Sequence, residues 1–264
     1  MKKIFIISLV LLFSFSALGI FLSPTLAKND KNLGKDQIIP EEDGIYEVAG
    51  HPEMKVRVFV HKVKPAPTPT PTPELACQLT DPSSNAFIEA TGWKLPDTYT
   101  YNLNPNSVPI LIDAADWPAI VQNSFGTWTD ETVGKVAIAR GSDTDVSRYS
   151  LDGTNLVAWG RASATTLGVT YIWYYSTGEV VEIDTIMNKK FVWEWSGGAT
   201  NCAYTDSYDA QNILTHEIGH WFGLKDHYTA GYEDNTMFGY GSKKETKKNT
   251  LTKGDIAGIL AIYQ

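Results

Sequence analysis

Basic residues are in the minority in this chain of 264 residues, because 22 Lys and Arg stand against 30 Asp and Glu and give a net charge of −8 at pH 7. Nucleic acids and anionic membranes attract proteins through positive charge, so the composition argues against both as partners. Long apolar runs are also scarce. Ile4 to Leu22 is the one segment long enough to be considered as a membrane span, and no second candidate follows it in the sequence.

That apolar run belongs to a pattern typical of secretory signals. Lys2 and Lys3 precede it, and Thr25-Leu26-Ala27 after it offers small residues at both recognition positions of a cleavage site. We therefore predict a signal peptide over residues 1–27 and a secreted, extracellular protein that is free of the membrane after cleavage. Loss of these lysines would bring the net charge to about −10. The alternative is a protein anchored in the membrane through an uncleaved signal.

Histidine is scarce as well, and three of the five histidines lie within one stretch, Thr215 to His227. His216 and His220 are four residues apart, and on a helix such positions lie one above the other on the same face. Both rings can therefore reach one metal ion, and Glu217 beside them can take a proton from a water bound to that ion. The spacing predicts a catalytic zinc site on a helix over residues 209–223. The alternative is a helix with two surface histidines and an ordinary glycine at its end.

A glycine follows where the chain would leave this helix. Gly223 permits the positive φ of such a turn, which can swing Asp226 or His227 back toward the ion as a third ligand. Carboxylate oxygen and imidazole nitrogen both suit zinc. The spacing favours Asp226, with His227 as the alternative, and the residue that is not a ligand is expected beside the site or at its rim.

Together with the methionine-containing turn Asn235-Thr236-Met237-Phe238-Gly239, these residues resemble the metzincin zinc metalloproteases, in the matrixin-like branch of bacterial secreted enzymes. The resemblance covers most of residues 90–264. Where most metzincins have a third histidine this chain has Asp226, and Leu224 to Tyr228 looks like the snapalysin-type variant with an aspartate ligand. The resemblance also implies that Met237 forms an apolar floor beneath the ion.

The fold that this resemblance implies is α+β. A twisted, mixed β-sheet of about five strands would be backed by a helix, with the active-site helix beside it and a small C-terminal subdomain containing the Met-turn. Substrate would lie as an added strand along Thr166–Trp173. The sequence itself suggests a helix that starts at Asp116-Trp117-Pro118 and a final helix capped by Thr252 and Asp255. Short apolar segments suggest strands around residues 99–103, 134–140, 155–159, 166–174 and 179–187.

The chain ahead of this region divides into two parts. Residues 28–64 contain two alternating stretches, 44–48 and 54–61, which are typical of strands in a prosegment or in a small surface module. Residues 65–75 repeat proline and threonine and predict an extended linker. The metalloprotease catalytic domain is then expected over residues 76–264.

The remaining candidate ligands are interpreted as structural. His51 and His61 are expected to be ordinary surface residues. The chain has two cysteines, Cys77 and Cys202, and an even number in an exported chain favours a disulfide. This disulfide would stabilise the fold by at most about 5 kcal/mol. The alternative is that Cys77 ligates the zinc as a thiolate and keeps the enzyme latent until a prosegment is removed. Ser242 to Lys248 is expected to be a solvated charged loop, and it could also line the pocket on the leaving-group side.

The sequence as a whole predicts a secreted, zinc-dependent endopeptidase that acts as a monomer on protein or peptide substrates, with Glu217 as the general base. The alternative is a non-catalytic metal-binding surface module on the same fold, against which the intact Glu217 argues. Calcium would suit an oxygen-rich stretch that has no EF-hand spacing. This stretch contains Asp143, Asp145, Ser147 and Asp152.

Overall fold

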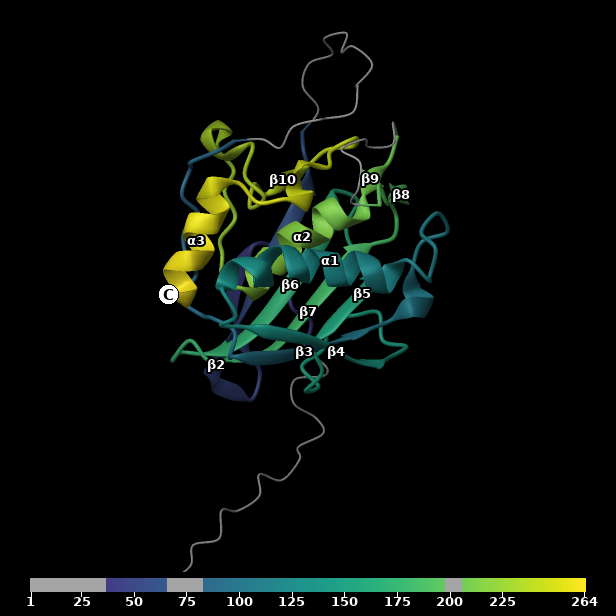
Figure 1. The fold of residues 1–264 in the computed structure, drawn as a ribbon. Coiled ribbons are helices and arrows are strands. Elements are labelled where there is room, and N and C mark those ends of the chain that lie inside the picture. Colours follow the sequence, from purple (N-terminus) through teal and green to yellow (C-terminus); the bar gives the residue numbers. More distant parts are fainter. Residues whose placement is uncertain (1–36, 66–82, 198–205) are drawn as a thin grey trace, which may run out of the picture. The chain divides into compact units, whose positions relative to one another are not determined.

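The computed structural model describes residues 37–65, 83–197 and 206–264. These residues form one mixed β-sheet, a separate pair of short strands and three α-helices, which confirms the predicted α+β fold (Figure 1). The strands are β1 (Gly44–Val48), β2 (His51–Val63), β3 (Thr98–Leu103), β4 (Ala137–Asp143), β5 (Leu156–Gly160), β6 (Thr166–Tyr175), β7 (Val180–Asn188), β8 (Trp193–Glu194), β9 (Tyr208–Asp209) and β10 (Tyr240–Gly241). The α-helices are α1 (Trp117–Thr129), α2 (Ala210–Trp221) and α3 (Lys253–Tyr263), and the short 3₁₀ turns are η1 (Pro105–Ser107), η2 (Asp130–Thr132), η3 (Ala230–Tyr232) and η4 (Lys247–Asn249).

The large sheet has the strand order β1-β2-β6-β7-β5-β3-β4, and β10 joins it by pairing with β2. The pairs β3–β4, β3–β5 and β5–β7 are parallel, whereas β1–β2, β2–β6 and β6–β7 are antiparallel. β5 is buried throughout and β6 nearly so, as expected of strands in the middle of a sheet with covered faces. The strands expected around 99–103, 155–159, 166–174 and 179–187 are confirmed as β3, β5, β6 and β7.

The N-terminal segment is part of this sheet. β2 pairs with β6 from Met54 to Lys62, and β1 pairs with β2 on its other side. The strands expected at 44–48 and 54–61 are confirmed. The catalytic region contributes β3 to β7, in agreement with the expected count of about five strands, and β1, β2 and the short β10 enlarge the sheet to eight. β6, along which substrate is expected to lie, is paired on both sides in this structure, by β2 and by β7.

β2 presents different side chains to its two faces, because successive residues of a strand point in opposite directions. On one face, its valines join an apolar cluster with the side chains of β6. This cluster includes Val56, Val58, Val60, Val169, Tyr171 and Trp173. On the other face, Phe59 and His61 lie against the rings of the α2 histidines. β2 therefore forms both a core strand and the cover of α2.

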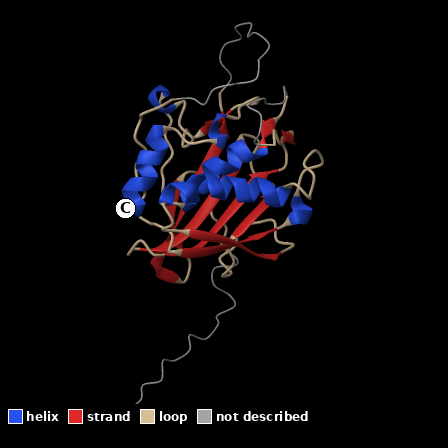
Figure 2. Cartoon of the chain, in the orientation of Figure 1, coloured by secondary structure: helices blue, strands red, loops and turns tan. Residues whose placement is uncertain are grey.

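α1 and α2 pack against each other on one face of the sheet (Figure 2). Trp117, Trp128 and Trp221 are fully buried in the core that the helices and the sheet share. α1 begins at Trp117 with a proline in its first turn, as predicted. Asp116 occupies the N-cap position, but its side chain makes no cap hydrogen bond.

α3 begins with the predicted capping box. The side chain of Thr252 accepts the backbone N–H of Asp255, and the carboxylate of Asp255 accepts that of Thr252. This carboxylate also accepts the backbone N–H groups of Thr236 at 3.0 Å and Met237 at 3.2 Å. The C-terminal helix thereby fixes the methionine-containing turn.

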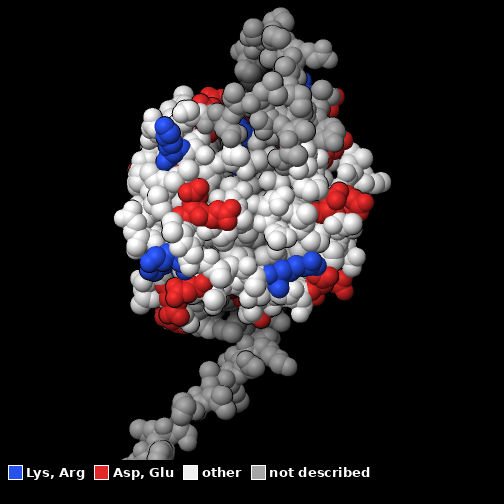
Figure 3. All heavy atoms as spheres, viewed as in Figure 1, with Lys and Arg blue, Asp and Glu red and all other residues white. Residues whose placement is uncertain are grey.

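One face of the molecule carries charged side chains of both signs in separate small groups (Figure 3). None of the helices in the described part of the chain is long and apolar enough to cross a membrane. The predicted signal peptide (1–27), all but one residue of the predicted linker (65–75), Cys77 and Cys202 lie outside the described residues. The signal and the disulfide therefore stay predictions.

Candidate metal centre

α2 places His216 and His220 on one buried face. The side chain of Asp209 accepts the backbone N–H of Asn212 at 2.8 Å, as an N-cap residue does, and so begins the helix. The two imidazole rings lie 4.9 Å apart, centroid to centroid, and neither is exposed. The helix predicted from the histidine spacing is confirmed.

Each of these rings is oriented by a hydrogen bond from Nδ1. His216 donates to the carbonyl oxygen of Thr236 at 2.7 Å, and His220 donates to that of Leu224 at 2.9 Å. Since these bonds place a proton on Nδ1, the neutral rings direct the lone pair of Nε2 to the other side. Burial lowers the pKa of His216 to about 4, which keeps this ring neutral.

A glycine turn brings Asp226 to the same place. Gly223 has φ +93°, and a Cβ atom at this position would lie 2.3 Å from the carbonyl oxygen of Trp93, so only glycine fits. Oδ1 of Asp226 lies 2.9 Å from Nε2 of His216 and 3.5 Å from Nε2 of His220. Burial acts to lower the pKa of His220, but Asp226, together with Glu217 and the carbonyl oxygen of Leu224, raises that pKa overall. The carboxylate thus favours a positive charge at this position.

These three side chains fit a zinc ion. Among the described residues there are two groups of possible ligands in which all ligand atoms lie within 4.8 Å of one another, and these three side chains form one of them. Tetrahedral zinc with ligand bonds of about 2.0–2.1 Å separates its ligand atoms by about 3.3 Å, which is close to the observed separations. Within the described chain, Nε2 of both histidines and Oδ1 of Asp226 are buried without a hydrogen-bond partner. A bound cation would satisfy all three atoms.

His227 lies outside this group. Its ring stacks on Tyr232 with 3.9 Å between the centroids, and its Nε2 lies 4.0 Å from a carboxylate oxygen of Glu89. Backbone hydrogen bonds with Met237 and Gly239 hold the residue beside the methionine-containing turn. The structure therefore brings together the histidines of α2 and Asp226, and places His227 at the rim.

Glu217 is held by one of its two oxygens. Oε2 accepts a hydrogen bond from the hydroxyl of Thr170 at 2.5 Å, and Thr170 is bonded to the hydroxyl of Thr185 at 2.8 Å. Trp221 donates to Thr185 at 2.9 Å and completes a buried chain. Burial raises the pKa of Glu217 to about 8. Oε1 has no hydrogen-bond partner among the described residues and is the oxygen left for a reacting group.

The sequence did not single out Thr170 and Thr185. The only available signal was alternation along two predicted strands, which places both hydroxyls on one face of the sheet. A buried glutamate could lie against that face. Their contact with Glu217 depends on how α2 crosses the sheet, and no local pattern specifies that crossing.

Met237 packs directly under α2. A Cβ atom at Gly219 would lie 2.2 Å from the sulfur of Met237, so the small residue permits this close approach. The side chain of Met237 is fully buried, and the preceding residue, Thr236, accepts the hydrogen bond of His216. The turn thus orients one histidine while its methionine fills the space beside the helix.

β2 covers the centre on the side of the sheet. The ring of Phe59 stacks on His220 at 3.8 Å between centroids, and the ring of His61 lies 3.9 Å from that of His216. Nδ1 of His61 is 4.0 Å from Oε1 of Glu217. His61 is fully buried, so its interpretation as a surface residue is wrong, because β2 lies between β6 and β10 and not on the outside.

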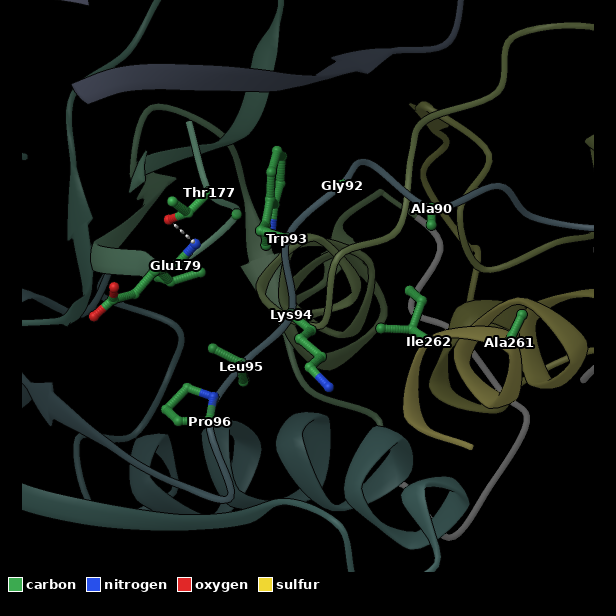
Figure 4. A pocket seen from close by; sticks show the side chains of 12 residues that line it. Ala90, Gly92, Trp93, Lys94, Leu95, Pro96, Thr177, Glu179, Ala261 and Ile262 are labelled. Atoms are coloured by element: carbon green, nitrogen blue, oxygen red, sulfur yellow. Dashed lines mark hydrogen bonds between the residues drawn. The ribbon is translucent and has the colours of Figure 1, made fainter. Parts of the chain in front are cut away.

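A cavity of about 340 Å³ lies next to Asp226 and is also lined by Asp43, Arg57, Tyr174 and Tyr228. A second cavity, of about 580 Å³, lies between the Trp93–Pro96 segment, the turn at Thr177–Glu179 and the end of α3 (Figure 4). None of the three candidate ligands lines this second cavity. Of these two cavities, only the one of about 340 Å³ is lined by a candidate ligand, Asp226.

The oxygen-rich stretch expected to suit calcium is tied to β7. The backbone N–H of Asp152 bonds to Glu182, and the N–H groups of Ser150 and Leu156 bond to Asp184. In the described part of the chain, Asp143, Asp145 and Asp152 belong to neither of the two groups of candidate metal ligands. Calcium stays a prediction.

Two imidazoles and a carboxylate that converge on one point, with a second carboxylate beside them, define a metal centre of the hydrolytic class. Residues 92–264 match the family model of the matrixins, and the chain belongs to this family. Matrixins are metzincin-type zinc metalloendopeptidases and are typically secreted. The protein is thus a zinc endopeptidase that acts on protein or peptide substrates, and the alternative of a non-catalytic module is not favoured. No curated protein matches the chain.

Proposed function

We propose that the protein is a secreted endopeptidase in which His216, His220 and Asp226 hold the zinc ion and Glu217 is the general base. The supporting observation is the convergence of four buried atoms that have no hydrogen-bond partner in the described chain: both Nε2 atoms, Oδ1 of Asp226 and Oε1 of Glu217. A zinc ion held by these three residues would lower the pKa of a bound water and polarise a peptide carbonyl. Oε1 of Glu217 accepts the proton of the attacking water and passes it to the leaving nitrogen, while Thr170 holds Oε2.

The proposal includes a prosegment over residues 28–64. A peptide that added to β6 would need the place that β2 occupies, and its backbone would need the space that Phe59 and His61 fill beside the histidine rings. Substrate can bind only after β2 has left. Cleavage within the predicted Pro-Thr linker that follows it would separate β2 from the catalytic domain.

The test uses the secreted full chain. Zinc content is measured by mass spectrometry, and casein hydrolysis is followed before and after proteolysis of the linker, with and without a chelator. We expect one zinc per chain and hydrolysis that appears after processing, stops with chelator and returns with added zinc. A chain that carries no stoichiometric zinc under metal-replete conditions would contradict the proposal.

Asp226→Ala is expected to weaken zinc binding by at least about 100-fold, because a tetrahedral site loses one of its three protein ligands and its charge. Zinc transfer to a chromophoric chelator measures the affinity. His227→Ala is the matched control, and its affinity should stay within about threefold of wild type. The opposite pattern, with zinc lost from the His227 variant only, would assign the third ligand to His227.

Thr170→Val is expected to lower kcat by about tenfold with little change in KM, because it removes the hydrogen bond that positions Glu217 and keeps the shape of the side chain. The comparison is made in the V58A/V60A background, where truncated valines weaken the packing of β2 on β6. Thr170→Ser should restore kcat, since it returns the hydroxyl. Equal kcat values for the valine and serine variants would show that the hydroxyl plays no part.

A further inference from the structure

Lys248, in the turn η4, has a fully buried side chain, which makes the interpretation of its loop as solvated wrong at this residue. Lysine is almost never fully buried unless its charge is paired. The Nζ atom donates to the carbonyl oxygens of Phe238 at 2.7 Å and Tyr240 at 2.8 Å, and it lies 3.0 Å from Nε2 of His61. Burial lowers the pKa of Lys248 to about 8. Oε1 of Glu245, 3.6 Å from Nζ, pairs the charge of the ammonium, and these three acceptors take its hydrogen bonds.

Three N–H donors meet three acceptors, which fixes the proton of His61. Since both carbonyls only accept, the third N–H of Lys248 points to Nε2 of His61, and the neutral ring carries its proton on Nδ1. Nδ1 faces Oε1 of Glu217 at 4.0 Å. A ring in this tautomer has no lone pair to offer a metal ion on that side. His61 is thus an acceptor for Lys248, and not a fourth zinc ligand.

The space that holds His61 is a narrow pocket. A Cβ atom at Gly241 would lie 2.6 Å from Ile213, 2.7 Å from Leu167 and 3.0 Å from Nε2 of His61, so the imidazole lies among these residues of α2, β6 and β10. Leu167, Ile213 and Gly241 form apolar walls, and His216 and Glu217 lie where the pocket faces the metal centre. One buried donor at the other end, Lys248, distinguishes side chains that accept a hydrogen bond from those that do not.

β2 itself is bound in the manner of an extended peptide. It pairs antiparallel with β6 on one side and parallel with β10 on the other, and Lys62 and Lys64 donate their backbone N–H groups to Gly239 and Gly241. Such main-chain contacts give affinity without sequence preference, and the side-chain pockets between them provide the preference. In this groove, the pocket beside Glu217 is the one that contains His61.

We propose that Lys248 is a specificity-determining residue, which selects substrates with a hydrogen-bond-accepting side chain at the position that β2 fills with His61. The inference rests on the proposed function, in which substrate replaces β2. When β2 leaves, one N–H of the buried Lys248 loses its acceptor. An imidazole, amide or carboxylate on the substrate restores it. An aliphatic side chain leaves this N–H unpaired, because Oε1 of Glu245, at 3.6 Å from Nζ, lies beyond hydrogen-bond distance.

The test uses the full-length V58A/V60A variant and three synthetic peptides with the sequence of residues 54–64. One peptide keeps histidine at position 61, and the other two have glutamine or leucine there. Each competes against hydrolysis of casein. We expect the histidine and glutamine peptides to inhibit at least about tenfold more strongly than the leucine peptide, because 1.4 kcal/mol corresponds to a factor of ten. Inhibition by all three at the same concentration would overturn the assignment of Lys248.

Lys248→Met provides the matched variant, since methionine keeps an unbranched side chain and lacks the donor. It should abolish the preference or reverse it in favour of leucine, and a preference that survived in a folded variant would overturn the inference. The comparison of peptides at unaltered Lys248 is decisive even if Lys248→Met does not fold. Chelator-sensitive casein hydrolysis in which none of the peptides competes would overturn the inference alone, whereas loss of zinc and of hydrolysis would overturn the proposed function itself.

Discussion

Glu217→Gln is expected to lower kcat/KM for peptide hydrolysis by about 1,000-fold while zinc remains bound at one ion per chain. The amide matches the carboxylate in size and can still accept the hydrogen bond of Thr170, but it cannot take a proton from water. The substitution replaces a fully buried ionisable group with a neutral one, so the folded state should not lose stability. Hydrolysis of a fluorogenic peptide and metal analysis of the same preparation measure both quantities.

The matched control is Glu89→Gln, because Glu89 lies at the rim beside Lys225 and His227 and is 55% exposed. This control should retain wild-type kinetics. Both substitutions are made in the V58A/V60A background, so that β2 does not limit the comparison. A Glu217→Gln variant that hydrolyses peptide at the rate of the control would end the assignment of the base.

Val58→Ala/Val60→Ala is expected to raise the hydrolytic activity of the unprocessed chain on the order of 100-fold. Both valines are buried in the cluster that joins β2 to β6, and each truncation costs about 2 kcal/mol. The two residues leave the cluster together with β2, so the substitutions destabilise the closed form and not the open one. Two such losses shift the opening equilibrium by roughly 10²–10³. Steady-state hydrolysis of an unrelated fluorogenic peptide measures the change.

A disulfide lock separates release of β2 from other effects of these truncations. Met54 and Tyr175 are paired across β2 and β6, and their side chains lie on the face away from α2. Cysteines at both positions in the V58A/V60A chain would suit a disulfide between antiparallel neighbours. The locked protein should be inactive until reductant is added, and V58A/V60A with the same reductant is the control. Full activity in the oxidised, locked protein would show that β2 does not block the site.

Local spacing was enough to predict the ligands and their helix. His216 and His220 lie on one face of any α-helix that contains them, and Gly223 is required at a turn with positive φ whatever surrounds it. The segment at 44–48 and 54–61 showed its strands through alternation. These features depend on neighbours a few residues away, which is why sequence patterns revealed them.

The partners of these elements could not be predicted in the same way. Alternation places Phe59 and His61 on one face of β2, but it does not say that this face meets α2. The hydrogen bond between His61 and Lys248 joins residues 187 positions apart, and the one between Thr170 and Glu217 joins residues 47 apart. A charged loop is normally solvated, so the burial of Lys248 had no signal of its own.

The sequence by itself determined a helix with two histidines on one face, a glycine turn that can return a third candidate ligand, and an N-terminal pair of strands. Only the tertiary structure decided that Asp226 lies with the two histidines while His227 lies at the rim, and that β2 occupies the strand position beside β6. The physical reason is the range of the interactions. Helix periodicity and turn geometry are set by adjacent residues, whereas strand pairing and burial depend on which distant segments meet, and that choice minimises the free energy of the whole chain.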